Sequence, residues 1–133
     1  MGGGDILLAT SDMHWAGRLA ELLRAEGYRV LISRTGVDAL YQARMQRPHL
    51  IFLDPDLPQL SGWEICRQLK QTPAQVPGKV VLITMEAVAA YRAGADGYIA
   101  KSGQIEPSLP PVHAFRAPQG ILQNFLHRRI LAA

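Results

Sequence analysis

The feature that most constrains the fold is the apolar run Leu50-Ile51-Phe52-Leu53, which ends directly in Asp54. An apolar run this short, bounded by turn residues, predicts a strand that is buried on both faces. Pro55 and Pro58 cannot donate hydrogen bonds to a neighbouring strand, so the strand must stop near Asp54. Open α/β sheets build their ligand crevices at the carboxyl ends of their strands, which makes Asp54 the first candidate for chemistry.

Strand and helix patterns alternate from Asp5 to Lys101 with short connections between them. The predicted strands span residues 5–10, 28–32, 49–54, 79–83 and 96–100. The predicted helices begin near Ser11 or Asp12, at Thr35 (a helix that carries Val37, Leu40, Tyr41 and Met45), at Gly62 and at Ala87. Such an alternation demands a mostly parallel sheet with right-handed crossovers and helices on both faces.

The chain divides into a core and less regular flanks. Residues 1–4 predict a flexible N-terminal tail, and residues 5–101 form the expected core domain. Residues 102–118 are rich in proline and predict an extended connection. Residues 119–133 recover helical spacing, which predicts a C-terminal helix that packs on the core or serves a partner.

Composition indicates one ordinary globular domain. The 133 residues are 48% hydrophobic and 19% charged, and no apolar stretch reaches the length of a membrane span. The net charge is +3, but the basic residues are spread along the chain, which favours a solvated surface over a nucleic-acid patch. Cys66 is the only cysteine and no signal peptide follows Met1, so we expect a cytoplasmic protein without disulfides.

Polar residues end three of the predicted strands, namely Asp54, Thr84 and Lys101. With Leu57-Pro58, Gly62 and Gly94-Ala95-Asp96-Gly97-Tyr98-Ile99 in the same order, they make the chain from Asp5 to Lys101 resemble the receiver domain of two-component response regulators. The resemblance implies a flavodoxin-like, doubly wound (βα)5 three-layer sandwich with strand order 2-1-3-4-5. In this chain the fourth helix is shortened and the C-terminal helix is displaced beyond the proline-rich stretch.

The resemblance also implies the role of the protein. It implies a signalling protein of a phosphorelay and not an enzyme, with a sensor histidine kinase or a phosphotransfer protein upstream. A downstream effector protein or a fused output domain would receive the signal. Homodimers are compatible with it, whereas membrane or nucleic-acid binding by this chain alone is not expected.

The resemblance assigns roles to single residues. Asp54 would accept the phosphoryl group, and Lys101 would pair first with Asp54 and then with a phosphoryl oxygen. The Thr84 hydroxyl would donate a hydrogen bond to that oxygen, and the ring of Tyr98 would follow Thr84 between two states. Asp54 and the backbone carbonyl of Asp56 would be ligands of a Mg²⁺ ion.

The chain departs from the family at the metal site. The first strand of the family ends in two adjacent carboxylates, and Thr10 and Ser11 occupy those positions here. Neutral hydroxyls are much weaker Mg²⁺ ligands than carboxylates. Asp12, one residue further on, is a candidate replacement ligand, but a residue that caps a helix points elsewhere. We therefore expect weak Mg²⁺ binding and a stable Asp54–Lys101 pair.

A second departure from the family lies after the fourth predicted strand. It bears on whether Asp54 can be phosphorylated. Met85 follows Thr84 where the family prefers a very small residue, so we expect its side chain to cover the approach of the phosphoryl group. The sequence is consistent with two functions. In the first, Asp54 is phosphorylated; in the second, the chain is a degenerate receiver that acts by protein contact without phosphorylation.

Two other classes are weaker matches. Asp54-Pro55-Asp56 after an apolar strand also resembles the paired aspartates of haloacid-dehalogenase-like phosphatases, but no downstream acidic pair supplies metal ligands. Nucleic-acid binding is a further hypothesis, suggested by the basic tail residues Arg116, His127, Arg128 and Arg129. No helix-turn-helix pattern accompanies them. The four histidines show no metal-ligand spacing.

Overall fold

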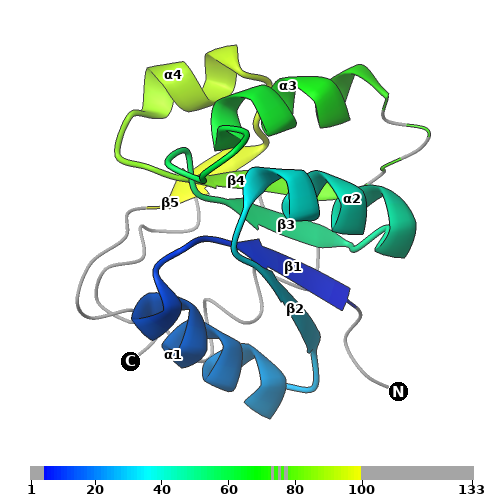
Figure 1. Cartoon of the computed structure of the whole chain (residues 1–133), viewed down its shortest axis with the longest axis vertical. Coiled ribbons are helices and arrows are strands. Elements are labelled where there is room, and N and C mark those ends of the chain that lie inside the picture. The colour runs from blue at the N-terminus through cyan, green and yellow to red at the C-terminus, as the bar shows by residue number, and fades with distance from the viewer. Residues whose placement is uncertain (1–4, 73, 75, 77, 100–133) are drawn as a thin grey trace.

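The computed structural model describes residues 5–72, 74, 76 and 78–99 of the chain. The strands are β1 (Asp5–Ala9), β2 (Arg29–Ser33), β3 (Leu50–Leu53), β4 (Lys79–Ile83) and β5 (Gly97–Ile99). The helices are α1 (Met13–Ala25), α2 (Gly36–Gln46), α3 (Gly62–Gln71) and α4 (Ala87–Arg92). These elements follow the predicted alternation, and Figure 1 shows how they are layered.

The strands form one parallel sheet in the order β2-β1-β3-β4-β5, as predicted. Helix α1 covers one face of the sheet, and α2, α3 and α4 cover the other (Figure 1). β3 lies at the centre and all four of its residues are buried. A strand that has helices on both faces must be apolar at every position, which is why Leu50–Leu53 does not alternate with polar residues.

Side chains near the helix starts fix where three helices begin. The side chains of Asp12, Thr35 and Ser61 accept hydrogen bonds from the backbone N–H groups of Trp15, Asp38 and Glu64. Each bond satisfies one of the N–H groups that the first turn of a helix leaves without a partner. The helix starts predicted near Ser11 or Asp12 and at Thr35 are therefore confirmed, with Asp12 rather than Ser11 as the cap of α1.

Helix α2 packs on the sheet in a way that the apolar pattern hides. Its buried residues are the small ones, Gly36, Ala39 and Ala43, which bring the helix axis close to the strands. Three of the four large apolar residues that mark this helix in the sequence are exposed, namely Val37, Tyr41 and Met45. The hydrophobic stripe of α2 thus faces away from the core of its own chain.

Several sequence predictions fall on parts of the chain outside the described residues. They are the tail 1–4, Lys101, the connection 102–118 and the helix 119–133. The fourth helix is short, as predicted, with six residues in α4. Within the described residues, no helix has the length and apolar character needed to cross a membrane.

The buried thiol of Cys66 gives a prediction for the pH dependence of stability. Burial raises the pKa of this thiol from 9.0 to about 12. Between these pH values the unfolded chain loses a proton that the folded chain keeps, so the free energy of unfolding falls as the pH rises through this range. In urea unfolding experiments from pH 9.0 to about 12, we expect the free energy of unfolding of Cys66→Ala to fall less steeply with pH than that of the wild type. An equal fall with pH in the two proteins would contradict the prediction.

Candidate functional site

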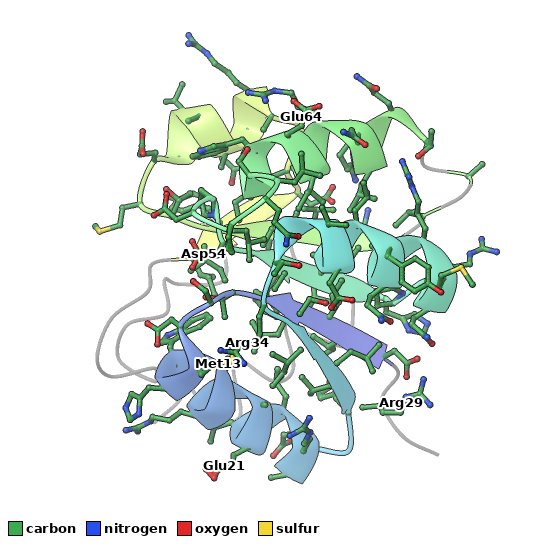
Figure 2. All side chains as sticks on the ribbon, viewed as in Figure 1. Met13, Glu21, Arg29, Arg34, Asp54 and Glu64 are labelled. Carbon is green, nitrogen blue, oxygen red and sulfur yellow. The ribbon has the colours of Figure 1, made fainter. Side chains whose placement is uncertain are left out.

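The site is built around Asp54 at the edge where β1 and β3 end (Figure 2). Asp54 follows β3 directly and is only 4% exposed. Its backbone N–H donates to the Ala9 carbonyl at 2.9 Å, which extends the pairing of β3 with β1 by one residue. Its Oδ1 accepts a hydrogen bond from the backbone N–H of Asp56 at 3.0 Å. The backbone and the following turn therefore fix the carboxylate in place.

Thr10 contacts the Asp54 carboxylate through its side chain. It follows β1 as Asp54 follows β3, and the register pairs the preceding residues Ala9 and Leu53. The Thr10 hydroxyl donates to Asp54 Oδ2 at 2.8 Å, and Thr10 is fully buried. The Thr10 hydroxyl oxygen in turn accepts from the backbone N–H of Asp12 at 3.1 Å. Thr10 thus links the start of the loop before α1 to the carboxylate.

Asp12 is directed toward the helix rather than toward Asp54. Its Oδ1 accepts from the backbone N–H of Trp15 at 3.1 Å, which is the N-cap bond of α1. Ser11 is exposed. Of the three residues at the end of β1, Thr10 is the one whose side chain is hydrogen-bonded to the Asp54 carboxylate at 2.8 Å.

Two glycines hold the loop that follows Asp54. The Gly36 N–H donates to the Pro58 carbonyl at 2.9 Å, and the Gly62 N–H donates to the Pro55 carbonyl at 3.2 Å. A Cβ atom on Gly62 would lie 2.4 Å from the Asp54 carbonyl oxygen, and one on Gly36 would lie 1.8 Å from the carbonyl oxygen of Leu60. Any larger residue would push this loop away from the helices. The two glycines therefore help to set the position of Asp54.

Thr84 lies directly after β4, beside β3 in the sheet. Its N–H donates to the Ile99 carbonyl at 2.7 Å, and its hydroxyl oxygen accepts from the Glu86 N–H at 3.1 Å. Because this oxygen accepts only from the turn, the hydroxyl hydrogen is still available to donate. Met85 is 81% exposed. Its side chain extends into solvent, so our expectation that it covers the phosphoryl approach is wrong.

Tyr98 lies on β5 and is partly buried against the α2–α4 side of the sheet. Its ring meets the ring of Tyr91 on α4 edge to face, with centroids 5.9 Å apart and planes at 86°. Edge-to-face pairs of this kind are favourable aromatic contacts. The contact packs β5 against α4, so a movement of the loop before α4 would change the surroundings of the Tyr98 ring.

The described residues do not fit a Mg²⁺ ion at Asp54. Among them, no group of three or more His, Cys, Asp or Glu side chains is placed to share one ion. Magnesium requires an octahedron of oxygens with carboxylate charge. The Thr10 hydroxyl is neutral and already donates to Asp54, while the Asp12 carboxylate caps α1. The side chain of Asp56 is exposed, and Lys101 lies outside the described residues.

Two residues that the sequence did not mark as a pair support the opposite end of the sheet, where β4 and β5 begin. Lys70 Nζ lies 2.8 Å from Asp96 Oδ2, and the same oxygen accepts from the Val80 N–H at 2.8 Å. Asp96 therefore anchors both α3 and β4. A cleft of about 640 Å³ between α3 and α4 is lined by Trp63, Arg67, Glu86, Ala87, Val88, Ala89 and Arg92. Asp54 does not line it, so this cleft is a separate feature from the site.

Removing the Thr10 hydroxyl tests the contact with Asp54. Thr10→Val keeps the shape but leaves Asp54 Oδ2 and the Asp12 N–H without this partner. We expect the free energy of unfolding to fall by about 1–3 kcal/mol, the usual cost of removing one partner of a buried hydrogen bond. The matched control is Thr84→Val, which removes a hydroxyl from a half-buried turn and is expected to cost under about 1 kcal/mol. Equal losses in urea unfolding would count against a special role for Thr10.

Comparison with known proteins places this chain in a family. The family model described as the response regulator receiver domain matches residues 6–107. The response regulator MprA of Mycobacterium leprae is 34% identical over 114 residues, covering 82% of this chain and 49% of that protein. The transcriptional regulatory protein AfsQ1 of Streptomyces coelicolor is 38% identical over 105 residues, covering 75% of this chain and 45% of that protein. The chain thus spans about half the length of these relatives.

Solved structures agree with the family model. The BeF3-activated receiver domain of DrrB, from Thermotoga maritima, is 31% identical with a TM-score of 0.66. The match covers 78% of this chain and 88% of that one. The fold, the order of the strands and the position of Asp54 after the central strand fit the same assignment. The chain belongs to the family of response regulator receiver domains, which are signalling proteins.

Proposed function

We propose that this chain is a receiver module of a two-component pathway that signals through contacts with other proteins and without phosphorylation of Asp54. The observation that carries the proposal is the hydrogen bond of 2.8 Å from the Thr10 hydroxyl to Asp54 Oδ2 inside a buried pocket. A hydroxyl stands there in place of a carboxylate that would hold a metal ion. Asp54 then serves to join the ends of β1 and β3.

Phosphoryl transfer to a carboxylate has two requirements that the described residues of this pocket meet poorly. The nucleophilic oxygen needs an open in-line approach, and the anionic phosphoryl group needs positive charge around it. Both oxygens of Asp54 already accept hydrogen bonds, from Thr10 and from Asp56, and the residue is 4% exposed. Without a carboxylate at Thr10, a metal ion has too few anionic ligands to stay bound. We therefore propose that Mg²⁺ binds weakly.

A second candidate function is phosphoryl acceptance at Asp54 from a histidine kinase or a phosphotransfer protein. The place of Asp54 favours it, because Asp54 ends β3 and Thr84 ends the neighbouring β4. In this function Lys101 would pair with the phosphoryl group and Thr84 would donate its free hydroxyl hydrogen to it. Tyr98 would report the change through its contact with Tyr91.

The length of the relatives bears on what receives the signal. Since the chain spans about half of MprA and AfsQ1, the activity of those whole proteins is not carried over to it. We propose that an effector protein, or an output domain joined to a receiver of this kind, reads the surface of the folded domain. The reduced, buried Cys66 is compatible with work in the cytoplasm.

Trp63 fluorescence tests the proposal. Trp63 is the second residue of α3, next to Gly62, whose Cβ position abuts the Asp54 carbonyl. In a Trp15→Phe background, we expect millimolar Mg²⁺ with beryllofluoride, the group bound in the activated DrrB structure, to leave the emission unchanged. A saturable change that Asp54→Asn abolishes would overturn the proposal and favour phosphoryl acceptance. Thr10→Asp in the same background shows whether Trp63 can report a bound ion.

A further inference from the structure

One face of the sheet has less cover among the described elements than the other. Helix α1 is the described helix on that face, whereas α2, α3 and α4 share the opposite face. Neighbouring strands lie about 4.8 Å apart, so the five strands reach about 19 Å from the axis of β2 to that of β5. A helix with its side chains is only about 10–12 Å wide, so α1 is wide enough for about half of its face.

Helix α1 lies over the β2 side of the sheet, yet the strands on the other side are equally buried. The helix packs against β2, and Figure 1 shows it beside that strand, at the opposite end of the strand order from β5. On the α1 face of β4 and β5, Val81, Ile83 and Ile99 are 0%, 4% and 1% exposed. We call these three residues the β4–β5 patch. Because α1 is too narrow to reach across the sheet, other atoms of the chain must shield this patch from water.

The cover for the β4–β5 patch has to come from outside the described residues. Among the residues that the structure describes, the buried members of the cluster that holds the patch come only from the strands and α1. Residues 1–4 are a methionine and three glycines, and residues 73, 75 and 77 are single positions between α3 and β4. The remaining stretch is 100–133. It follows β5 directly, so it begins beside the patch.

Within this stretch, residues 119–133 have the pattern of a helix that covers a sheet. Four large apolar residues recur at helical spacing and fall on one side of a helix, namely Leu122, Phe125, Leu126 and Ile130. Asn124 and His127 fall on the opposite side. A helix of these residues would be about 22 Å long, against about 20 Å for the 13 residues of α1. The segment therefore matches α1 in length and has the apolar side that the β4–β5 patch requires.

The connection between β5 and this segment favours the patch of the same chain over that of a second copy. An extended chain spans about 3.3 Å per residue, so residues 100–118 reach up to about 60 Å, about three times the width of the sheet. A tether of this kind keeps the segment at a local concentration on the order of millimolar. Even a weak apolar contact within the chain is then made in preference to one between chains.

We propose that the β4–β5 patch is a docking site for residues 119–133 of the same chain, which bind it as a helix through their apolar side. That side of the segment is then turned toward the sheet and is not free for an effector, which has to read other surfaces of the domain. The docking does not depend on the state of Asp54, because the patch lies within β4 and β5 whereas Asp54 follows β3.

Thermal unfolding of the full 133-residue chain, followed by circular dichroism, tests the proposal. Phe125→Asp places a charge against the β4–β5 patch, and we expect its unfolding midpoint to fall by about 10 °C or more. The matched control is Asn124→Asp, which adds the same charge one residue away on the polar side. It is expected to shift the midpoint by less than about 4 °C. Equal shifts in the two variants would overturn the proposal, as would a loss in Phe115→Asp that Phe125→Asp does not share.

A double-mutant cycle tests where on the sheet the segment docks. Val80 and Val81 are neighbours on β4 and both are fully buried, but Val81 belongs to the α1 face and Val80 to the opposite face. In a Phe125→Ala background, we expect Val81→Ala to raise the unfolding equilibrium constant about three- to tenfold less than it does in the wild type, because the two side chains touch or share one cavity. Val80→Ala is expected to have the same effect in both backgrounds, within about twofold.

Phe125→Leu, a milder change, serves the same cycle if Phe125→Ala does not fold. Equal coupling of Phe125 to both valines, or coupling to neither, would overturn the proposal. An unfolding midpoint of the wild type that rises with protein concentration would assign the docked segment to a second copy of the chain, which would overturn it as well.

Discussion

The double variant T10D/S11D is expected to bind Mg²⁺ tightly enough to gain stability from it, whereas the wild type gains almost none. The substitutions return two carboxylates to the end of β1, where Thr10 already contacts Asp54 at 2.8 Å. Two or three carboxylates around one point provide the charged oxygen ligands that Mg²⁺ prefers. Binding to the folded state alone raises the free energy of unfolding, by about 2.7 kcal/mol when the ion is at one hundred times its dissociation constant.

Without the ion, the same variant is expected to be less stable than the wild type. It loses the hydroxyl that donates to Asp54 Oδ2 and gains a like charge beside a carboxylate that is 4% exposed. We expect a loss of about 2–4 kcal/mol, since Asp54 loses the hydrogen bond from Thr10 and gains a like-charged neighbour. Urea unfolding with and without millimolar Mg²⁺ measures both effects.

The control for this prediction adds Asp54→Asn to T10D/S11D. It removes one carboxylate and the repulsion together, so both the loss without the ion and the gain with it should shrink. If Mg²⁺ stabilises the wild type as much as T10D/S11D, the hydroxyl at Thr10 does not limit metal binding and the account of this pocket fails.

Gly36→Ala is expected to lower the free energy of unfolding by about 3 kcal/mol, the upper range for overpacking a rigid site. A Cβ atom at this position would lie 1.8 Å from the Leu60 carbonyl oxygen and 2.6 Å from the carbonyl carbon. These are backbone atoms that cannot rotate away, so the loop after Asp54 has to move. The hydrogen bond of 2.9 Å from the Gly36 N–H to the Pro58 carbonyl would be strained or lost with it.

Gly17→Ala is the matched control for that prediction. Gly17 lies inside α1, and a Cβ atom there would meet no atom within 4 Å. Alanine is favoured over glycine within a helix by about 0.5–1 kcal/mol, so this variant is expected to be more stable than the wild type. Urea unfolding of the two variants should therefore move in opposite directions. A Gly36→Ala protein as stable as Gly17→Ala would show that the loop is not held as described.

The sequence was enough to predict the fold because local and global signals agree. The apolar run before Asp54 predicts a central strand, and β3 is buried along its whole length. Alternating strand and helix patterns allow few topologies, and the order β2-β1-β3-β4-β5 is the one that the resemblance implies. Element ends differ by a residue or two, as at β2, which covers Arg29–Ser33 against the predicted 28–32.

The sequence was less informative about the faces of α2. Large apolar residues usually mark the buried side of a helix, but here Ala39 and Ala43 occupy that side and Tyr41 does not. Alanine fits either a buried or an exposed position, so helical spacing alone cannot separate the two faces. Only the distance between the helix and the sheet decides, and that distance is a property of the assembled fold.

The candidate site shows the same limit at finer scale. The sequence alone shows that Thr10 and Ser11 replace the acidic pair of the family. It also predicts the N-cap role of Asp12, from its place before a helix. The bond between Thr10 and Asp54 joins residues 44 positions apart, and its direction depends on the rotamer of a hydroxyl. The exposed position of Met85 also depends on the course of the turn after β4. Neither follows from spacing.

Intact mass spectrometry after incubation with Mg²⁺ and a small-molecule phosphodonor tests the central claim most directly. The wild type should be measured beside T10D/S11D and Asp54→Asn under identical conditions. If Thr10 holds Asp54 in a pocket without metal charge, the wild type gains no phosphoryl adduct, and T10D/S11D, with its carboxylates restored, gains one. A phosphoryl adduct on the wild type that is absent from Asp54→Asn would contradict the account and make Asp54 a working phosphoryl acceptor.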